Sequence, residues 1–196
     1  MFDLSQDPFS HLEKFHREAR EKKLVEPDAM TLATVGPDGQ PSARVVYYKG
    51  PAHGGLSFYT NYQGQKGREI ETNPKVCVNF YWAEIWQQIR VYGIAEKMTR
   101  AESEKYFATR ARLSQLGAWA SHQSEEIPDY QFFQNKLDQY EIQFAGKDVP
   151  CPEYWGGYRI EPTRYEFWFG HEGRLHERYV YSRDSDQSWV TSLLSP

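Results

Sequence analysis

The sequence predicts an α+β fold, mainly β, with about six to eight strands in a closed antiparallel barrel that carries helices. Short segments in which apolar and polar residues alternate recur along the chain, for example at Val76, Val78 and Phe80. Turn signals such as Asp38-Gly39 separate them at short intervals. Neither of the glycine-rich phosphate-binding motifs of parallel α/β folds occurs, so a Rossmann or P-loop domain is not predicted.

The first half of the chain is predicted to begin with a helix and to continue mainly as strands. Asp7 and Pro8 form an N-cap and a first-turn proline, and apolar residues then recur at helical spacing, so we expect a helix over residues 8–23. The expected elements that follow are strands over 30–35, 42–49 and 55–60, a polar helix over 65–72, and strands over 76–80 and 89–95.

The second half is predicted to hold two helices and the last strands. We expect a helix over residues 100–109 and another marked by Phe133 and Phe144, which Gly146 ends. The expected C-terminal strands, within about 154–196, cover 158–160, 164–169, 174–181 and 189–193. With no repeat and no linker, one domain over 1–196 is the simplest organisation.

Composition limits the possible partners. The chain has 23 Lys and Arg against 27 Asp and Glu, a net charge of −4, so no basic excess suggests nucleic acid or an anionic membrane surface. No apolar run reaches the roughly 18 residues of a membrane span, and the N-terminus lacks a signal-peptide pattern. The two lone cysteines, Cys77 and Cys151, favour a reducing compartment, so we expect a cytoplasmic protein. Aromatic residues reach 16% and suit a rich core and dimer interface, or the walls of a flat ligand site.

Two patches in the first half combine cations with hydroxyl groups, as phosphate sites do. Arg44 and Lys49 lie on one predicted strand and point to opposite faces unless a bulge intervenes. Thr60 precedes Lys66 at a helix start, and a helix N-terminus with such side chains nearby can hold a phosphate.

Two further patches follow in the second half. Tyr106, Arg110 and Ser114 are spaced by four, which puts them on one face if the helix continues. Arg174, His176 and Arg178 would share one face of a strand. His171 and His176 are five residues apart rather than four, so they do not match a zinc helix, and no metal site is predicted. Separate cationic sets are suited to two different phosphates.

Taken together and in this order, the segments resemble the pyridoxamine 5'-phosphate oxidase family from about Asp7 to the C-terminus. The motifs that carry the resemblance are Ala33-Thr34-Val35, Arg44 with Lys49, Phe58-Tyr59-Thr60-Asn61, Lys105-Tyr106-Phe107, Ser114-Gln115-Leu116-Gly117-Ala118-Trp119, Gln123-Ser124, Trp155-Gly156-Gly157, Glu166-Phe167-Trp168 and Arg174-Leu175-His176-Glu177-Arg178.

This resemblance implies an FMN-binding split β-barrel homodimer with active sites shared between subunits. The implied FMN contacts are Arg44, Val45, Val46, Lys49, Tyr59, Thr60, Gln65, Lys66 and Gln88 on one side of the cleft, and Gln123, Ser124, Trp168 and Arg178 across it. The implied substrate contacts are Lys49, Tyr106, Arg110 and Ser114 at the phosphate, and Arg174, Leu175 and His176 at the pyridine ring, with Arg174 and His176 as the catalytic candidates.

The implied activity is oxidation of pyridoxamine or pyridoxine 5'-phosphate to pyridoxal 5'-phosphate. A hydride passes from the 4' carbon to flavin N5, dioxygen reoxidises the flavin to give hydrogen peroxide, and the amine also releases ammonia. One alternative is a phenazine-biosynthesis FMN oxidase of the same fold, which residues 65–69 and 87–89 also suit. The other is a protein that binds flavin or pyridoxal phosphate without turnover.

Three departures from the family pattern stand out. Gln65 occupies the place of an arginine, so the flavin phosphate lacks a charged contact worth roughly 1.5–3 kcal/mol unless Arg68 compensates. Leu193 stands where arginine is usual near the C-terminus. We also expect no basic arm ahead of the first helix to cover the substrate.

Overall fold

The computed structural model describes residues 2–196. In chain order its elements are α1 (Pro8–Glu21), β1 (Ala29–Val35), β2 (Pro41–Tyr47), β3 (Pro51–Ala52), β4 (Gly55–Asn61), α2 (Gln65–Thr72), β5 (Lys75–Trp82), the short turn η1 (Ala83–Ile85), β6 (Gln87–Lys97), α3 (Arg100–Ala108), α4 (Arg112–Ala120), α5 (Tyr130–Gln143), β7 (Trp155–Phe169), η2 (Glu172–Arg174), β8 (Glu177–Arg183) and β9 (Trp189–Leu194).

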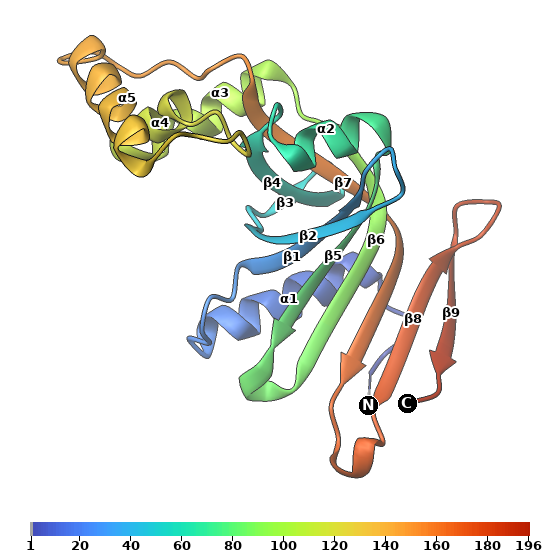
Figure 1. The fold of residues 1–196 in the computed structure, drawn as a ribbon. Coiled ribbons are helices and arrows are strands. Elements are labelled where there is room, and N and C mark those ends of the chain that lie inside the picture. Colours follow the sequence, from blue (N-terminus) through green and yellow to red (C-terminus); the bar gives the residue numbers. More distant parts are fainter. Residues whose placement is uncertain (1) are drawn as a thin grey trace.

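The strands form one nine-stranded antiparallel sheet (Figure 1). Its order is β2-β1-β5-β6-β7-β4-β3, and β8 and β9 extend it from β7. The chain closes the sheet where it leaves β2: the Lys49 amide donates to the Ser57 carbonyl of β4 at 2.9 Å, and the Ser57 amide donates to the Gly50 carbonyl at 3.2 Å, so the end of β2 lies beside β4. The predicted α+β antiparallel barrel with helices is therefore confirmed.

Strand β7 joins the barrel to the C-terminal extension. Its first part pairs with β4 and its second part with β8, while β6 pairs along almost its whole length. The prediction of two separate strands around Pro162 is therefore wrong. Pro162 lies opposite Gly93, where the register shifts, and a Cβ on Gly93 would come within 2.4 Å of the Glu161 carbonyl oxygen. A bulge and a glycine thus let the proline remain inside a continuous strand.

The start of β8 also differs from the prediction. Gly173 and Arg174 both have positive φ angles, 65° and 61°, which are incompatible with a strand. They form η2, Leu175 and His176 follow as a loop, and β8 begins only at Glu177. The alternation predicted that Arg174, His176 and Arg178 share one strand face. This prediction is wrong, because only Arg178 lies on a strand.

The helical segment after β6 is interrupted at Arg110. Helix α3 begins with a capping box between Thr99 and Glu102 and ends at Ala108, and a separate helix, α4, starts at Arg112. The helix expected over 100–109 is thus confirmed, but it does not continue, so the condition under which Tyr106, Arg110 and Ser114 would share one helix face is not met. Helix α4 was not predicted as an element of its own.

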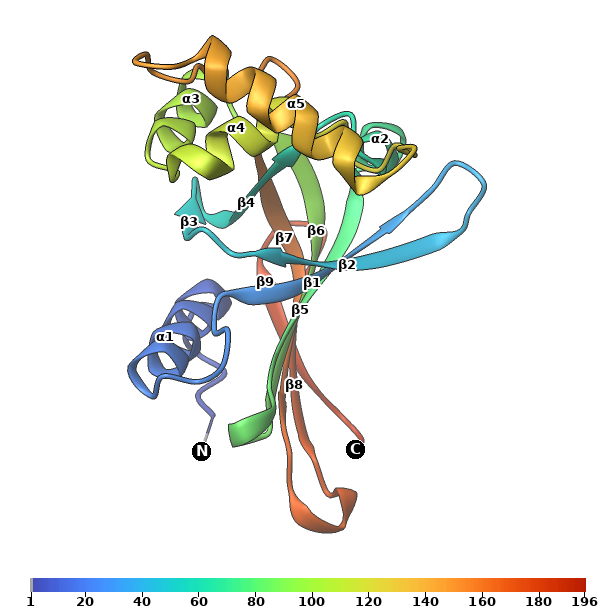
Figure 2. The ribbon, with the colours of Figure 1, turned by 60° about the vertical axis from the view of Figure 1, so that its left-hand side comes forward.

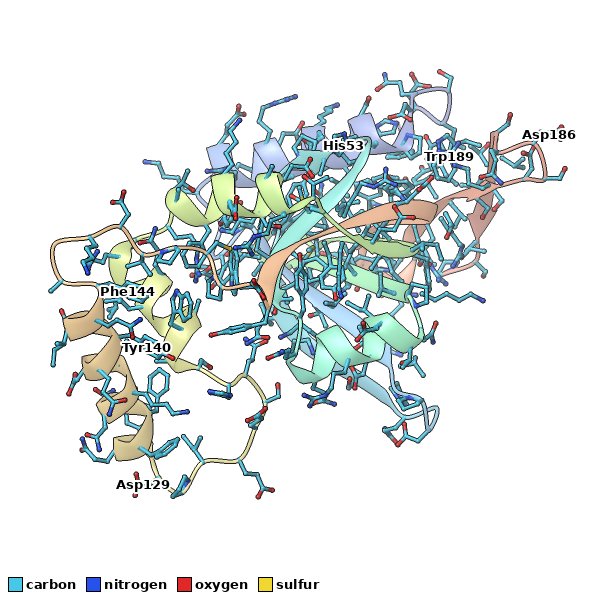
Figure 3. All side chains as sticks on the ribbon, turned by 90° about the horizontal axis from the view of Figure 1, so that it is seen from above. His53, Asp129, Tyr140, Phe144, Asp186 and Trp189 are labelled. Atoms are coloured by element: carbon cyan, nitrogen blue, oxygen red, sulfur yellow. The ribbon has the colours of Figure 1, made fainter. Side chains whose placement is uncertain are left out.

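Two hydrophobic clusters position the functional residues. The larger one fills the barrel beneath α1 and includes Leu12, Phe58 and Val78. The smaller one joins α3, α4 and α5, which lie together at one end of the sheet (Figure 2). There the rings of Tyr140 on α5 and of Phe144 directly after it, both labelled in Figure 3, lie 5.6 and 5.5 Å from the Trp119 ring. None of the helices between residues 2 and 196 is both long and apolar enough to cross a membrane.

Candidate active site

One group of polar side chains surrounds the start of α2. We call it the α2 cluster; its members are Thr34, Ser42, Arg44, Thr60, Lys66 and Glu69. Arg44 donates to the hydroxyl oxygens of Thr34 and Ser42, and its Nη2 lies 3.2 Å from Glu69 Oε2. Burial disfavours the charged form of Glu69, but hydrogen bonds from Thr34, Ser42 and Gln65, with the charge of Arg44, outweigh it and hold the pKa at about 2. The cluster therefore keeps a buried carboxylate beside its arginine.

Lys66 is the second cation of the α2 cluster, and its residue is only 9% exposed. Its Nζ donates to Thr60 Oγ1 at 3.1 Å and to Gln123 Oε1 at 2.6 Å, both neutral acceptors. Burial, together with the nearby charge of Arg44, lowers the pKa of Lys66 to about 8. An ammonium can only donate, so the amide oxygen of Gln123 must face Lys66.

A second group lies around Arg110. The Arg110 pocket has a volume of about 240 Å³, and its lining residues are Asn61, Arg110, Ser114, Gly117, Ala118, Ser121, Gln123 and Trp155. The guanidinium carbon of Arg110 lies 4.6 Å from the centre of the Trp155 ring. Arg110 and Ser114 thus meet in one pocket although a helix break separates them. Tyr106 does not line it but stacks on Tyr59, with ring centres 3.8 Å apart.

A third group occupies the face of the sheet that points away from the barrel core. This outer-face pocket has a volume of about 350 Å³, and its lining residues are Tyr81, Gln88, Arg90, Glu166, Trp168, Arg178 and Pro196. Glu166 is 1% exposed and accepts hydrogen bonds of 3.0 and 2.8 Å from Arg178, and Arg90 lies 3.6 Å from it. Sequence reasoning missed Arg90. Its place two residues after Gln88 on a strand was the available signal.

The implied FMN contacts were divided into an early set, up to Gln88, and a late set, from Gln123 onwards. Their neighbours in the structure do not follow this division. Gln88 was expected on the side of Arg44 and Lys66, but it pairs with Trp168, which pairs in turn with Arg178. Gln123 was expected on the side of Arg178, but within one chain it accepts from Lys66. Within one chain, the structure therefore groups Gln88 and Gln123 differently from the expected partition, which stays a prediction for the dimer.

The two sets also extend from opposite faces of the sheet. Arg44 lies opposite the fully buried Leu32, whereas Gln88 lies opposite the exposed Tyr81. Side chains of one strand alternate between faces, and paired residues share a face. A single planar ligand that touches both sets must therefore use two copies of the chain or pass around a sheet edge.

The loop that ends at β8 carries the residues expected at the pyridine ring. Arg174 and Leu175 are exposed, and the His176 ring lies 4.6 Å from the ring of Trp168. The backbone amide of His171 donates to His176 Nδ1 at 3.2 Å. A backbone N–H cannot accept, so a neutral His176 carries its proton on Nε2.

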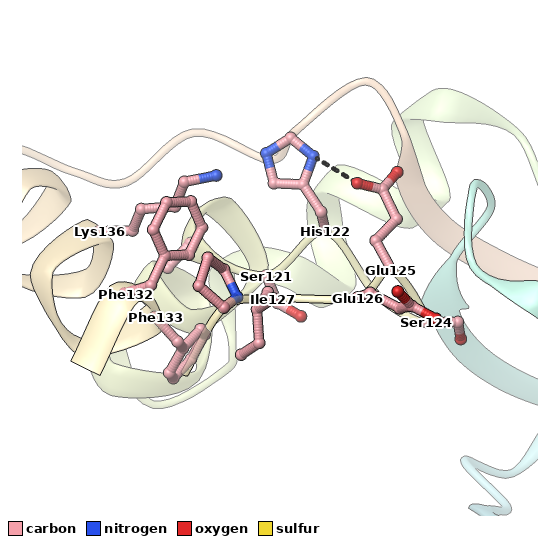
Figure 4. A pocket seen from close by; sticks show the side chains of 11 residues that line it. Ser121, His122, Ser124, Glu125, Glu126, Ile127, Phe132, Phe133 and Lys136 are labelled. Atoms are coloured by element: carbon pink, nitrogen blue, oxygen red, sulfur yellow. Dashed lines mark ion pairs between the residues drawn. The ribbon is translucent and has the colours of Figure 1, made fainter. Parts of the chain in front are cut away.

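The remaining expected contacts are dispersed. Val45 is exposed and Val46 is buried, as alternation requires. Lys49 lies outside the Arg110 pocket, with its Nζ 5.2 Å from the centre of the Tyr47 ring. Ser124 is exposed and lines a separate hollow of about 300 Å³ between the loop after α4 and the start of α5, beside the His122–Glu125 pair (Figure 4).

Comparison with protein families gives two matches that together cover most of the chain. Residues 15–144 match the model of pyridoxamine 5'-phosphate oxidase. Residues 155–196 match the pyridoxine 5'-phosphate oxidase C-terminal dimerisation region, in agreement with the expected homodimer. The expected single domain over 1–196 stays a prediction.

Individual relatives agree with these matches. The chain is 55% identical to the pyridoxine/pyridoxamine 5'-phosphate oxidase of Bdellovibrio bacteriovorus over the full length of both proteins. It is 49% identical to that of Rubrobacter xylanophilus over 97% of this chain and 87% of the relative. A crystal structure of PhzG from Burkholderia lata, in complex with tetrahydrophenazine-1-carboxylic acid, superposes with a TM-score of 0.93 at 32% identity and covers 99% of this chain and 95% of that one. The family matches and the full-length identity show that the chain belongs to the pyridoxamine 5'-phosphate oxidase family.

Proposed function

We propose that the protein oxidises pyridoxamine 5'-phosphate and pyridoxine 5'-phosphate to pyridoxal 5'-phosphate, with dioxygen as electron acceptor and hydrogen peroxide as product. The observation that carries this proposal is the presence of two separate cationic sites that share Gln123. Two sites of this kind match two phosphorylated ligands, a flavin mononucleotide and a phosphorylated substrate.

FMN is the cofactor of this family, and the α2 cluster fits its phosphate. Lys66 is a buried ammonium whose hydrogen-bond acceptors are two neutral oxygens, so a phosphate would supply the counter-charge that it lacks. When bound, FMN supplies the two-electron acceptor of the reaction. We assign Arg44, Thr60 and Lys66 to its phosphate, and Gln88, Trp168 and Arg178 of a second copy to its ring system.

The Arg110 pocket is suited to the phosphate of the substrate. Arg110 brings a charge, and Ser114, Gln123 and Asn61 surround it with neutral hydrogen-bonding groups. We assign Arg174 and His176 to the pyridine ring, where the Nε2 proton of a neutral His176 is available to donate. These residues hold the reacting carbon in position, and such orientation is the main contribution of a protein to cofactor chemistry. The lone cysteines, both free, suit the cytoplasmic location that we infer.

An anaerobic spectrum tests the proposal. We expect pyridoxine 5'-phosphate to bleach the flavin bands of the purified protein, and air to restore them with release of hydrogen peroxide and accumulation of pyridoxal 5'-phosphate. Bound FMN that stays oxidised in the presence of either B6 phosphate would contradict the oxidase proposal and favour a binding protein without turnover.

The superposition on PhzG supports one alternative, an oxidase of a tricyclic acid. The same anaerobic assay with tetrahydrophenazine-1-carboxylic acid separates the two. A carboxylic acid without phosphate does not require the Arg110 pocket, so bleaching by this acid that survives Arg110→Ala would move the alternative ahead.

A further inference from the structure

We infer that Trp155 is a positioning residue for substrate binding, whose indole face holds the guanidinium of Arg110 in place for the substrate phosphate. This inference rests on the proposed function and deepens it. Trp155 is the first residue of β7 and is 6% exposed. It belongs to the small cluster at the end of the sheet and also lines the Arg110 pocket.

The guanidinium of Arg110 depends on aromatic faces. Its central carbon lies 4.6 Å from the centre of the Trp155 ring and 5.5 Å from that of Phe107. Nη1 is buried, and no atom of residues 2–196 accepts a hydrogen bond from it. Within the same residues, no carboxylate forms an ion pair with Arg110. The indole is therefore the nearer of the two aromatic faces that can compensate the buried end of this cation.

An aromatic face has a different consequence from a carboxylate partner. A carboxylate would satisfy the guanidinium, but it would also offset its charge and repel an incoming phosphate. A ring attracts the cation through its quadrupole and adds no net charge. Arg110 consequently enters the pocket with its full positive charge, although burial lowers its pKa.

The Trp155 ring is itself fixed by its neighbours. It lies nearly parallel to Tyr59 and Tyr106, at 5.6 and 6.3 Å, and meets Phe107 edge-on at 5.0 Å. Gly157 permits this packing, because a Cβ there would come within 2.8 Å of the Tyr59 ring. The stack gives Tyr106 a structural connection to Arg110 even though it does not line the pocket.

Two substitutions distinguish the effect of the aromatic face of Trp155 from the effect of its apolar volume. Trp155→Leu keeps an apolar side chain but removes the face, whereas Trp155→Phe retains a smaller face. We expect the leucine variant to raise the dissociation constant for pyridoxine 5'-phosphate, measured anaerobically by calorimetry, by about threefold to thirtyfold, the weight of one cation–π contact. The phenylalanine variant should recover most of the affinity. The loss with unphosphorylated pyridoxine should be clearly smaller than the loss with its phosphate, since pyridoxine brings no phosphate to Arg110. FMN content is measured in parallel, because Trp155 also packs on Tyr59.

A double-mutant cycle completes the test. In an Arg110→Ala background, Trp155→Leu should have no further effect on binding of pyridoxine 5'-phosphate, because the cation that it holds is gone. If the leucine variant does not fold, Trp155→Phe is compared in both backgrounds, with an expected loss of about twofold that vanishes when Arg110 is absent. Additive effects, or an equal loss with unphosphorylated pyridoxine, would show that Trp155 only supports the fold.

Inorganic phosphate as a second probe distinguishes this inference from the proposed function. If the parent protein binds phosphate in a manner that depends on Arg110 and Trp155 but oxidises no B6 phosphate, the oxidase proposal fails and the positioning role stands. If it oxidises pyridoxine 5'-phosphate and Trp155→Leu leaves the phosphate affinity unchanged, the positioning role fails and the oxidase proposal stands. In FMN-loaded protein, whose α2 cluster is occupied, phosphate binding that does not depend on Arg110 overturns the positioning role.

Discussion

The two cationic sites of this protein differ in what surrounds the positive charge. In the α2 cluster, Arg44 is bonded to hydroxyl groups and to the buried carboxylate of Glu69, and Lys66 donates to neutral oxygens. In the Arg110 pocket, no such carboxylate is present within residues 2–196, and the cation rests against Trp155. One site is a hydrogen-bonded network with its own anion, and the other is a single charge on an aromatic face.

This difference indicates two ways to bind a phosphate. A network spreads the binding over several residues and offsets part of its own charge, which suits a cofactor that stays bound. A single uncompensated arginine concentrates the binding in one residue, which suits a substrate that must enter and leave. We therefore expect loss of Arg110 to weaken binding of the substrate and not of FMN. Substitutions in the α2 cluster should change FMN affinity by degrees, and this affinity should depend on pH.

The largest expected effect tests whether the α2 cluster of one subunit and the outer-face pocket of the other form a single active site. Lys66→Glu and Arg178→Glu should each abolish activity, because each places a negative charge at an anionic cofactor. Refolded together in equal amounts, the two variants should recover about a quarter of the parent activity, since half of the dimers are mixed and each has one intact site. Dimers that form normally but stay inactive in the mixture would show that Lys66 and Arg178 serve one site within a single chain.

The second prediction tests whether Arg110 alone contributes most of the binding free energy of the substrate phosphate. Arg110→Ala should raise the Michaelis constant for pyridoxine 5'-phosphate at least tenfold, since loss of one partner from a buried charge pair costs about 2–5 kcal/mol. FMN content should hardly change. Unphosphorylated pyridoxine should be a poor substrate of the parent, and the substitution should affect it little. Flavin loss in this variant would instead place Arg110 at the cofactor.

The third prediction uses the pKa of Lys66. In the FMN-free protein this pKa is lowered to about 8, so the side chain loses its proton above that pH. A bound phosphate favours the charged form, and FMN binding must then take up a proton. The dissociation constant for FMN, measured by flavin fluorescence, should rise by up to about tenfold per pH unit above pH 8 and stay nearly flat just below it.

The lowered pKa of Lys66 has the opposite effect on the stability of the FMN-free protein, which should increase with pH where FMN affinity decreases. Between about pH 8 and the ordinary value of 10.5, the unfolded chain binds more protons than the folded one, so the free energy of unfolding should rise with pH. Lys66→Arg is the matched control, because arginine keeps its charge throughout. A parent protein whose FMN affinity follows the same pH profile as this variant would exclude Lys66 as the titrating group.

Most elements could be predicted from sequence because their signals are local. The alternation in β5 and the N-cap at Asp7 are examples. The end of α3 near Thr109 was expected, but the start of α4 at Arg112 gave no such signal, because its N-cap residue, Ala111, has no side chain that can accept a hydrogen bond from the first turn. The continuity of β7 through Pro162 depends on Gly93, about 70 residues away in sequence.

The candidate site divides in the same way. Residue types and spacing identified the cations Arg44, Lys66 and Arg110. They could not show that Gln88 lies beside Trp168 or that Gln123 contacts Lys66, because these contacts come from strand register and from the loop after α4. Chain order is a poor guide to such neighbours in an antiparallel sheet with long-range pairing.

The smallest expected effect concerns Gln65, which stands in place of the arginine of the family pattern. Gln65 Nε2 donates to Glu69 Oε1 at 2.8 Å. A guanidinium introduced by Gln65→Arg lies within reach of the same carboxylate, which would draw it away from the flavin phosphate. A charged hydrogen bond is worth roughly 1.5–3 kcal/mol, so an arginine free to reach the phosphate would tighten FMN by about tenfold or more. With Glu69 in competition, we expect a gain of about threefold.

Glu69→Gln supplies the control for this last comparison. It removes the competing charge while keeping the shape of the side chain, so Gln65→Arg in that background should approach the full gain in FMN affinity. Arg68 is not expected to take over this role, because its guanidinium donates to the backbone carbonyl of Gln63 at the surface. A gain above tenfold with Glu69 intact would mean that the carboxylate does not limit the α2 cluster. The contrast with the Arg110 pocket would then depend on the number of hydrogen bonds rather than on a built-in anion.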